Sequence, residues 1–274
     1  MVAEGPLARV YRARPSEASP QQSPAYSLKM LRKEWQEDPK AVASLHCEAE
    51  AGRSVANPHL IPVLAARLSG PPYYLVMPWL EGRTLGAHLA SPASLDLPMV
   101  LWIVRQVAEG LAAMDDAGWV HGDVKPANIF VSPDGHATLL DLGFARRPGQ
   151  SGSIADRCVL GTCSYMAPEV MTSALGADIR SDLYSLGVVL FEALAGRLPF
   201  TGNTLSQMVE QHKQARPPLL RRLRPAVPTG VADLVAALLS KQPLRRPQTP
   251  RELIRRLVEL EIETFAERAS SPGA

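Results

Sequence analysis

The spacing of apolar and polar residues changes about a third of the way along the chain. Before that point, short apolar runs bounded by turn-forming residues predict β-strands. These runs are Val10–Ala13, Tyr26–Leu31 and Tyr73–Trp79. Between the first two lies Pro15–Pro24, which is rich in Ser, Gln and Pro and predicts a loop. A helix is predicted over Pro39–Ser54, and Asn57 and Pro58 break the pattern after it.

After Gly82 the apolar residues recur at the spacing of helices. Within Pro98–Ala117 they follow one another in alternating steps of four and three residues, which places them on one helix face. The residues of this face are Val100, Val104, Val107, Leu111 and Met114. Gly118 supplies a helix stop. The strongly apolar stretch Ser181–Gly196 predicts a central helix.

Two further patterns complete the prediction of the fold. Short strands over Asn128–Val131 and Ala137–Leu140 flank the turn signal Pro133–Gly135. Thr249–Glu252 is a capping box with proline at the first helical position, and it opens an amphipathic helix through about Phe265. A strand-rich front part and a helical rear part predict an α+β fold, with a small β-rich lobe and a larger helical lobe.

Composition adds limits on the class of protein. The chain has 274 residues, of which 46% are hydrophobic and 20% charged, enough to bury a core without disulfides. The formal net charge of +2 argues against nucleic-acid binding and against bulk affinity for a membrane surface. The most apolar stretch, Leu183–Gly196, is interrupted by Glu192, so we expect no membrane segment.

The cellular compartment is predicted from two absences in the sequence. The first ten residues contain Glu4, Pro6 and Arg9 and lack the apolar run of a signal peptide. The 3 cysteines are too few and too scattered for a disulfide framework, and they fit a reducing compartment. Together these features predict a cytoplasmic location.

The polar residues with the most informative spacing lie in the loop after the first long helix. Asp123 can orient and deprotonate a hydroxyl group, Lys125 can neutralise a transferring phosphoryl group, and Asn128 can hold a metal ion. Asp141 follows a predicted strand and precedes the glycine hinge Gly143, where a second metal ligand is expected. This order of residue types predicts a site for phosphoryl transfer.

Four short motifs stand in a fixed order along the chain. They are the strand motif Tyr26–Lys29, the loop His121–Asn128, the metal motif Asp141–Gly143 and the segment Ala167–Glu169. Together they resemble the V-A-I-K, catalytic-loop, DFG and APE motifs of a eukaryotic-type (Hanks-type) serine/threonine protein kinase domain, with a bacterial-like character. The resemblance implies a two-lobed kinase fold over residues 1–266, divided into an N-lobe of 1–77, a hinge of 78–82 and a C-lobe of 83–266, and followed by a flexible tail of 267–274.

The resemblance also implies which residues bind ATP and Mg²⁺. Lys29 would bind the α- and β-phosphates of the nucleotide, and Glu48 would form an ion pair with that lysine. Asn128 and Asp141 would hold Mg²⁺. The nucleotide would further contact Gly5, Val10, Ser27, Met77, Pro78, Leu80 and Phe130, with Met77 as the gatekeeper and Pro78 and Leu80 offering hinge backbone groups.

Five further residues are implied to support this site. Asp182 would brace the catalytic loop from the central helix, and Arg246 would pair with Glu169. His121 is expected to pack under the loop rather than to act as an acid or base. Thr162 is expected to lie near the catalytic aspartate.

The same resemblance favours protein serine and threonine hydroxyls as acceptors. Lys125 and Thr162 are typical of serine/threonine kinases. Small-molecule phosphotransferases share the His-Gly-Asp sequence but lack that lysine and the Gly-Thr…Ala-Pro-Glu segment, which makes them the less favoured alternative.

A pseudokinase that acts as a nucleotide-binding or scaffold module is the main alternative. Gly122 replaces the arginine that usually precedes the catalytic aspartate. Of the three glycine positions in the phosphate loop, Ala3, Gly5 and Ala8, only one is kept, and Pro6 removes an N–H donor. The first strand of the sheet is expected to be missing or truncated. Gly52, one turn after Glu48, replaces a bulky apolar residue and predicts weak docking of that helix.

Overall fold

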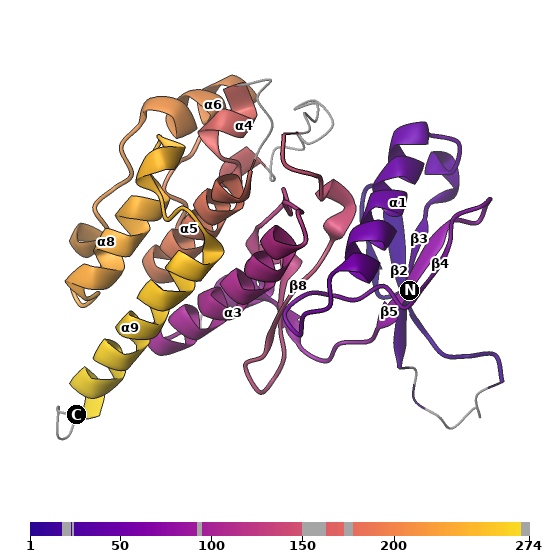
Figure 1. Cartoon of the computed structure of the whole chain (residues 1–274), viewed down its shortest axis with the longest axis horizontal. Coiled ribbons are helices and arrows are strands. Elements are labelled where there is room, and N and C mark those ends of the chain that lie inside the picture. Colours follow the sequence, from indigo (N-terminus) through magenta and orange to yellow (C-terminus); the bar gives the residue numbers. More distant parts are fainter. Residues whose placement is uncertain (18–22, 24, 92–94, 150–162, 173–177, 270–274) are drawn as a thin grey trace.

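The computed structural model describes residues 1–17, 23, 25–91, 95–149, 163–172 and 178–269. Within these ranges, a five-stranded sheet and one long helix form one side of the molecule, and the remaining long helices form the other (Figure 1). This arrangement confirms the predicted α+β fold with a small β-rich lobe and a larger helical lobe.

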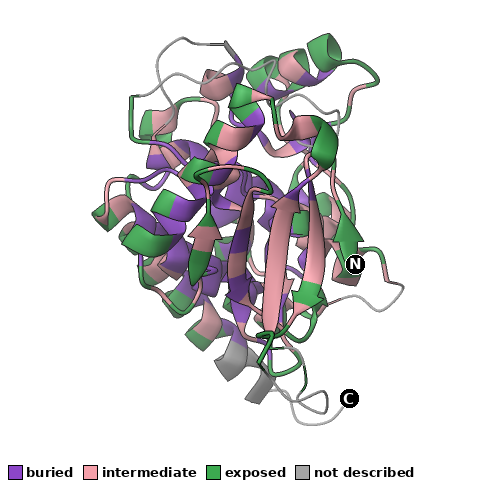
Figure 2. Cartoon of the chain, turned by 90° about the vertical axis from the view of Figure 1, so that its right-hand side faces the viewer, coloured by how far each residue is buried: buried purple, intermediate pink, exposed green. Residues whose placement is uncertain are grey.

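The sheet of the small lobe is antiparallel throughout and has the strand order β1-β2-β3-β5-β4. The strands are β1 Ala3–Glu4, β2 Ala8–Ala13, β3 Tyr26–Leu31, β4 Ala65–Arg67 and β5 Tyr74–Pro78. β3 has the predicted bounds, whereas β2 begins before Val10 because Ala8 pairs with Leu31 at the far end of β3. β1 has only 2 residues, so the expectation of a truncated first strand is confirmed. Most strand residues are only half-buried, in contrast to the core of the helical lobe (Figure 2).

Helix α1, Pro39–Ser54, has the predicted bounds and packs against the sheet (Figure 1). Asp38 caps its first turn by accepting a hydrogen bond from the N–H of Lys40 at 2.8 Å. Small and apolar residues of its buried face join one cluster with Leu31 and Met77 of the sheet. This packing carries the carboxylate of Glu48 into the interior, where only 2% of its surface stays exposed.

Gly52 marks the closest approach between α1 and the segment that follows it. A Cβ atom at Gly52 would lie 2.7 Å from Cγ2 of Val63, and the Gly52 carbonyl accepts a hydrogen bond from the N–H of Val63 at 3.1 Å. The expectation that Gly52 weakens the docking of this helix is therefore wrong. The glycine permits a close contact that a side chain would block.

We expect Gly52→Ala to lower the free energy of unfolding by about 1–3 kcal/mol, because the added methyl group overpacks Val63. Helix propensity alone gives the opposite sign, a gain of about 1 kcal/mol. Urea unfolding distinguishes the two. Gly70→Ala is a suitable control, since a Cβ at Gly70 has no heavy atom within 4 Å. A more stable Gly52→Ala protein would contradict the close packing.

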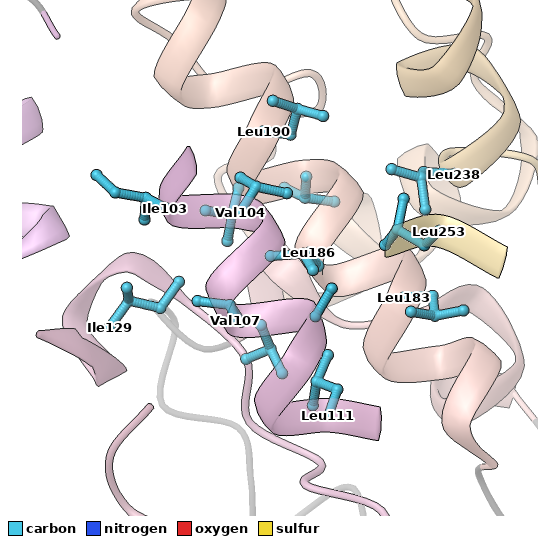
Figure 3. Packing of buried hydrophobic residues seen from close by; sticks show 14 of the residues in the cluster. Ile103, Val104, Val107, Leu111, Ile129, Leu183, Leu186, Leu190, Leu238 and Leu253 are labelled. Atoms are coloured by element: carbon cyan, nitrogen blue, oxygen red, sulfur yellow. The ribbon is translucent and has the colours of Figure 1, made fainter. Parts of the chain in front are cut away.

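The larger lobe is built around α3 and α5. Its helices are α2 Leu85–Leu89, α3 Leu97–Asp116, α4 Pro168–Thr172, α5 Ile179–Ala195, α6 Leu205–Gln214, α7 Leu220–Leu223, α8 Thr229–Leu238 and α9 Pro250–Ala269. Side chains of α3 such as Val104 and Val107 pack with Leu186 of α5 in one continuous core (Figure 3). α5 begins before Ser181 because Asp178 caps it by accepting a hydrogen bond from the N–H of Arg180 at 2.9 Å.

A small sheet with the order β6-β7-β8 completes this lobe. Its strands are β6 Arg83–Thr84, β7 Ile129–Val131 and β8 Ala137–Leu139, so the last two match the predicted hairpin to within one residue. Among the described helices, α3 alone is long and apolar enough to cross a membrane, but 61% of that stretch is buried inside the protein, as in a core helix.

Helix α9 extends farther than the sequence pattern predicts. It packs along α3 and ends at Ala269 rather than near Phe265. The first residues of the expected tail, 267–269, are therefore helical. The physical reason is the absence of a glycine or proline after Pro250 until Pro272, so that nothing ends the helix earlier.

Candidate active site

Lys29 lies at the centre of a charged cluster between the sheet and α1. Its ammonium Nζ is 2.7 Å from Oε2 of Glu48 and 2.8 Å from Oδ1 of Asp141. β3 positions Lys29, α1 positions Glu48, and Asp141 follows β8. The structure thus brings together three residues that the sequence analysis assigned to phosphate and metal binding.

In this cluster the Lys29 ammonium forms ion pairs with both carboxylates. The pKa values of Glu48 and Asp141 shift in opposite directions. Burial disfavours the charge of Lys29, but Asp141 and Glu48 outweigh that effect and raise the pKa of the lysine. Burial also opposes ionisation of Asp141, yet the Lys29 ammonium outweighs it and holds the pKa of Asp141 below its usual value. At Glu48 burial is the stronger effect and, against the attraction of Lys29, raises the pKa to about 7.

The raised pKa of Glu48 predicts a pH dependence of stability. The folded protein binds this proton more tightly than the unfolded chain, whose glutamates titrate near 4.5. The contribution of Glu48 to the free energy of unfolding is therefore complete below pH 4.5 and is lost as the pH rises through about 7. The loss amounts to about 1.4 kcal/mol for each unit of pKa shift.

We expect Glu48→Gln to remove this loss of stability between pH 4.5 and 7. Urea unfolding of the metal-free protein at several pH values measures it. Glu50→Gln, a change at an exposed position of the same helix, is the control. Parallel pH profiles for the wild type and Glu48→Gln would contradict the assignment.

The catalytic loop places Asp123, predicted to activate the hydroxyl, in contact with Lys125 and Asn128, predicted to neutralise the phosphoryl group and to hold a metal ion. Asp123 is nearly buried, and its Oδ2 lies 2.8 Å from Nζ of Lys125. The same Oδ2 accepts a hydrogen bond from Nδ2 of Asn128 at 2.8 Å, and the Asp123 carbonyl accepts a second one at 2.9 Å. Burial raises the pKa of Asp123, while Lys125 and Asn128 act in the opposite direction.

A second layer of hydrogen bonds holds this loop to α5. The carboxylate of Asp182 accepts the N–H of His121 at 2.7 Å and the N–H of Gly122 at 2.8 Å. Gly122 has a φ of 79°, a conformation that a side chain would strain. Nδ1 of His121 accepts the N–H of Asp123 at 3.2 Å, which leaves Nε2 to donate to the Leu140 carbonyl at 3.1 Å.

Burial lowers the pKa of His121, so its ring stays neutral and supports the loop. The structure therefore places His121 and Asp182 beneath Asp123, where the sequence analysis expected supporting residues.

A backbone hydrogen bond at the end of β8 links the segments that carry the two residues predicted to hold Mg²⁺. The N–H of Leu140 donates to the Asn128 carbonyl at 2.7 Å, which places Asp141 beside the catalytic loop. Asp141 is the only described non-glycine residue with a positive φ, 62°, and 37% of its side chain stays exposed.

The chemistry of these residues fits Mg²⁺. Nδ2 of Asn128 is used by Asp123, so its amide oxygen and the Asp141 carboxylate are the available ligand atoms. No cluster of three or more His, Cys, Asp or Glu suited to a metal occurs among the described residues. A cation held by only two protein side chains agrees with the preference of Mg²⁺ for phosphate and water as its other ligands.

Most residues predicted to surround adenine share one face of the sheet. Val10 is paired with Lys29, and Ser27 is paired with Met77, so these side chains point to the side of the sheet that carries Lys29. The hydroxyl of Ser27 donates to the carbonyl of Pro78 at 3.2 Å. Leu80 follows β5, and Phe130 is half-buried in β7.

Gly5 lies in the turn between β1 and β2. Its N–H donates to the Ala8 carbonyl at 2.9 Å, and Nη1 of Arg32 approaches the Gly5 and Pro6 carbonyls at 3.3 and 3.4 Å. The Gly5 N–H is therefore used within the turn, and Pro6 has none to offer. The folded loop therefore offers few free N–H donors to a phosphate group, as the sequence predicts.

Glu169 and Arg246 form the predicted pair, which joins α4 to the segment before α9. The guanidinium donates to both carboxylate oxygens, at 2.6 and 2.8 Å, and none of the Arg246 side chain is exposed. Ser181 Oγ also donates to Glu169 at 2.9 Å. Thr162, the remaining supporting residue, lies outside the described residues.

Two contacts of α1, one with the metal motif and one with Ala145 just after it, were not predicted. Ser44 Oγ donates to the Gly143 carbonyl at 2.9 Å, and Cys47 Sγ contacts the Ala145 carbonyl. A Cβ at Gly143 would lie 2.7 Å from Ser44 Oγ, so the glycine permits this approach. The sequence held one signal for the Ser44 contact. Ser44 and Glu48 are four residues apart, so they lie on the same helix face.

The rim of the adenine side holds a second unpredicted group. The Arg12 guanidinium lies 4.6 Å from the centroid of the Trp79 ring. Both side chains also donate to Oε1 of Glu81, at 2.9 and 2.8 Å. This exposed contact links β2 to the segment after β5.

Comparison with known proteins agrees with this geometry. A family model described as a protein kinase domain matches residues 2–257. Similar curated proteins include the serine/threonine-protein kinase PrkC of Bacillus subtilis, 30% identical over 227 residues, which are 83% of this chain and 35% of that protein. Pkn2 of Myxococcus xanthus is 38% identical over 216 residues, 75% of this chain and 26% of that protein. PknL of Mycobacterium tuberculosis is 34% identical over 220 residues, 80% of this chain and 55% of that protein.

This chain therefore matches about a quarter to about half of the length of these relatives. All three are named serine/threonine-protein kinases, and none is named a pseudokinase or a small-molecule phosphotransferase. Because the family match covers nearly the whole sequence and the motif residues meet in one site, the chain belongs to the protein kinase domain family.

Proposed function

We propose that this protein is a serine/threonine protein kinase that transfers the γ-phosphoryl group of ATP to protein hydroxyls. The observation that carries the proposal is the junction of two clusters. Lys29, Glu48 and Asp141 form the first, and Asp123, Lys125 and Asn128 form the second. The hydrogen bond between the Leu140 N–H and the Asn128 carbonyl joins them.

Each of these residues has a role that follows from its position. Asp123 accepts the proton of the acceptor hydroxyl, and Lys125 next to it stabilises the negative charge on the transferring group. Lys29, held by Glu48, binds the nucleotide phosphates. Mg²⁺, which Asn128 and Asp141 would hold through oxygen atoms, supplies further neutralisation of phosphate charge.

A cavity of about 510 Å³ beside Lys125 supports a polypeptide acceptor. Its lining residues are Gly86, Leu89, Ala90, Lys125, Pro126, Ala127, Tyr165 and Glu192. They come from α2 and the residue after it, the catalytic loop, the turn Cys163–Tyr165 and α5. Tyr165 donates its hydroxyl hydrogen to Glu192 at 2.7 Å, which ties two of the lining side chains together. Such a space next to the catalytic residues suits a side chain of an extended substrate segment.

Two measurements test the function. A thermal shift with and without Mg·ATP detects nucleotide binding, and transfer of radiolabelled phosphate to a serine- or threonine-containing protein detects catalysis. Lys29→Met should abolish transfer and leave the fold intact. Binding without transfer by the wild type would favour the pseudokinase alternative. The use of ATP also agrees with a cytoplasmic location, which remains a proposal.

A further inference from the structure

A surface of concentrated positive charge lies beyond the end of α6. From Gln211 to Ala232 the chain contains five basic residues and no aspartate or glutamate. A sixth basic residue, Arg197, follows α5. All six are exposed. We call this group the basic face, and its members are Arg197, Lys213, Arg216, Arg221, Arg222 and Arg224.

The fold fixes the basic face and brings its two segments together. Leu220 of α7 is buried in the core of the helical lobe, which leaves Arg221 and Arg222 on the outer side of that helix. Nη2 of Arg224 lies 3.8 Å from the position that a Cβ atom of Gly196 would occupy. Arg224 therefore reaches the end of α5, where Arg197 follows.

The basic face has no counter-charge within the described parts of the chain. No described carboxylate forms an ion pair with any of the six side chains. Glu263 of α9 comes close to Gly230, but it does not pair with Arg221. Instead, Nη1 of Arg221 donates a hydrogen bond to Oγ1 of Thr229 at 2.9 Å. Like charges gathered in this way repel one another, so an anionic partner stabilises them.

The composition of the basic face indicates the kind of anion. All of its residues except Lys213 are arginines, whose planar guanidinium groups bind carboxylates through two parallel hydrogen bonds. Leu219, which lies among them in the sequence, is 62% exposed and offers an apolar contact. The net charge of the whole chain is only +2, which argues against a membrane surface or a nucleic acid as the partner.

We propose that the basic face binds an acidic segment of a protein substrate, outside the residue that is phosphorylated. The inference rests on the proposed function and names a substrate class for it. That class is proteins in which a stretch rich in glutamate or aspartate accompanies the serine or threonine that accepts the phosphoryl group.

Helix α5 connects the basic face to the acceptor cavity. Glu192 of this helix lines the cavity beside Lys125. Gly196, next to Arg224, follows four residues later, which is about 6 Å along a helix axis. An extended polypeptide covers about 3.3 Å with each residue. A short segment of substrate therefore reaches from the cavity to the basic face.

Fluorescence anisotropy without nucleotide tests the binding directly. The probes are a fluorescein-labelled, glutamate-rich peptide with one central leucine and the same peptide with every glutamate replaced by glutamine. The wild-type protein should bind the glutamate peptide at least about 10-fold more tightly than the glutamine peptide, and added salt should weaken that binding. Arg222→Glu/Arg224→Glu should raise the dissociation constant of the glutamate peptide by at least about 10-fold, because two attractions become two repulsions.

A second double variant separates the place of the charges from their number. Arg67→Glu/Arg255→Glu changes the net charge equally, at exposed positions of β4 and α9, and should leave the dissociation constant within about 2-fold of the wild type. Thermal unfolding establishes that each variant is folded. Arg222→Gln/Arg224→Gln, which removes the charges without reversing them, should weaken binding by about 3-fold and keeps the test decisive if the glutamate variant is unstable.

The effect on transfer should be confined to KM. Linking the glutamate-rich sequence to a threonine-containing acceptor peptide should lower the KM of the wild type by about 10-fold and leave kcat unchanged. In Arg222→Glu/Arg224→Glu the acceptor peptides with and without the acidic sequence should have KM values within about 2-fold of each other.

Equal binding of the two labelled peptides by the wild type, or equal losses in the two double variants, would overturn the proposal. Binding to phosphatidylglycerol vesicles that requires Arg222 and Arg224, without binding of the glutamate peptide, would overturn it in favour of a membrane surface. Phosphoryl transfer without peptide binding would overturn this inference alone. Peptide binding without any transfer would support the binding of acidic segments and overturn the kinase function.

Discussion

Asp123→Asn should lower kcat by about 10²- to 10⁴-fold, the usual contribution of a general base, while leaving the fold and the binding of Mg·ATP intact. The substitution keeps the shape of the side chain, so Asn128 can still donate to an oxygen at this position. What it removes is the negative charge that accepts the hydroxyl proton and that pairs with Lys125 at 2.8 Å.

Single-turnover transfer of radiolabelled phosphate measures this loss, and calorimetry measures nucleotide binding separately. Asp134→Asn is the matched control because Asp134 is exposed in the turn between β7 and β8, away from the catalytic loop. An Asp123→Asn protein with a rate near that of the wild type would rule out Asp123 as the base.

Glu169→Ala should lower the free energy of unfolding by about 3–5 kcal/mol, because it leaves the fully buried guanidinium of Arg246 without a counter-charge. Arg246 keeps hydrogen bonds to the carbonyls of Arg180 and Ser240, at 2.9 and 2.8 Å, but carbonyls do not neutralise its charge. For a domain of this size the melting temperature should fall by about 6–20 °C.

Two comparisons isolate the cause. In the double variant Glu169→Gln/Arg246→Met no charge is left buried, so it should be more stable than Glu169→Ala alone. Asp116→Ala breaks an ion pair of similar length, 2.6 Å, between Asp116 and Arg251. Both side chains are exposed, Asp116 to 55% and Arg251 to 69%. That change should cost less than about 1 kcal/mol. Equal losses for Glu169→Ala and Asp116→Ala would contradict the role of burial.

The sequence by itself determined the elements whose signals are local. The bounds of β3 and α1 were predicted correctly, because an apolar run between turn residues defines the strand and the breaker Asn57–Pro58 follows the helix. The short strand β4 was not predicted, since its three residues carry no clear alternation. Where neighbours along the chain set the conformation, the pattern of residue types was sufficient.

The residues of the site could be named from the sequence, in part from spacing and in part from the family resemblance, but their ionisation state could not. The resemblance implied that Lys29, Glu48 and Asp141 act together in binding phosphate and Mg²⁺. Only the fold shows that a single ammonium serves both carboxylates, and that burial then raises the pKa of Glu48 to about 7. Ionisation depends on distance and solvent exposure, which sequence spacing does not contain.

Packing between distant segments was decided by the tertiary structure alone. By helix propensity Gly52 is a weak point, yet in the folded protein Val63 occupies the space where its side chain would be. By residue type Ser27 is one more residue of the adenine pocket, yet its contact with Pro78, 51 residues away, makes it a polar group of the hinge. Local periodicity records which face of an element is apolar, but not which atoms of another element meet it, because those contacts form only when the whole chain has folded.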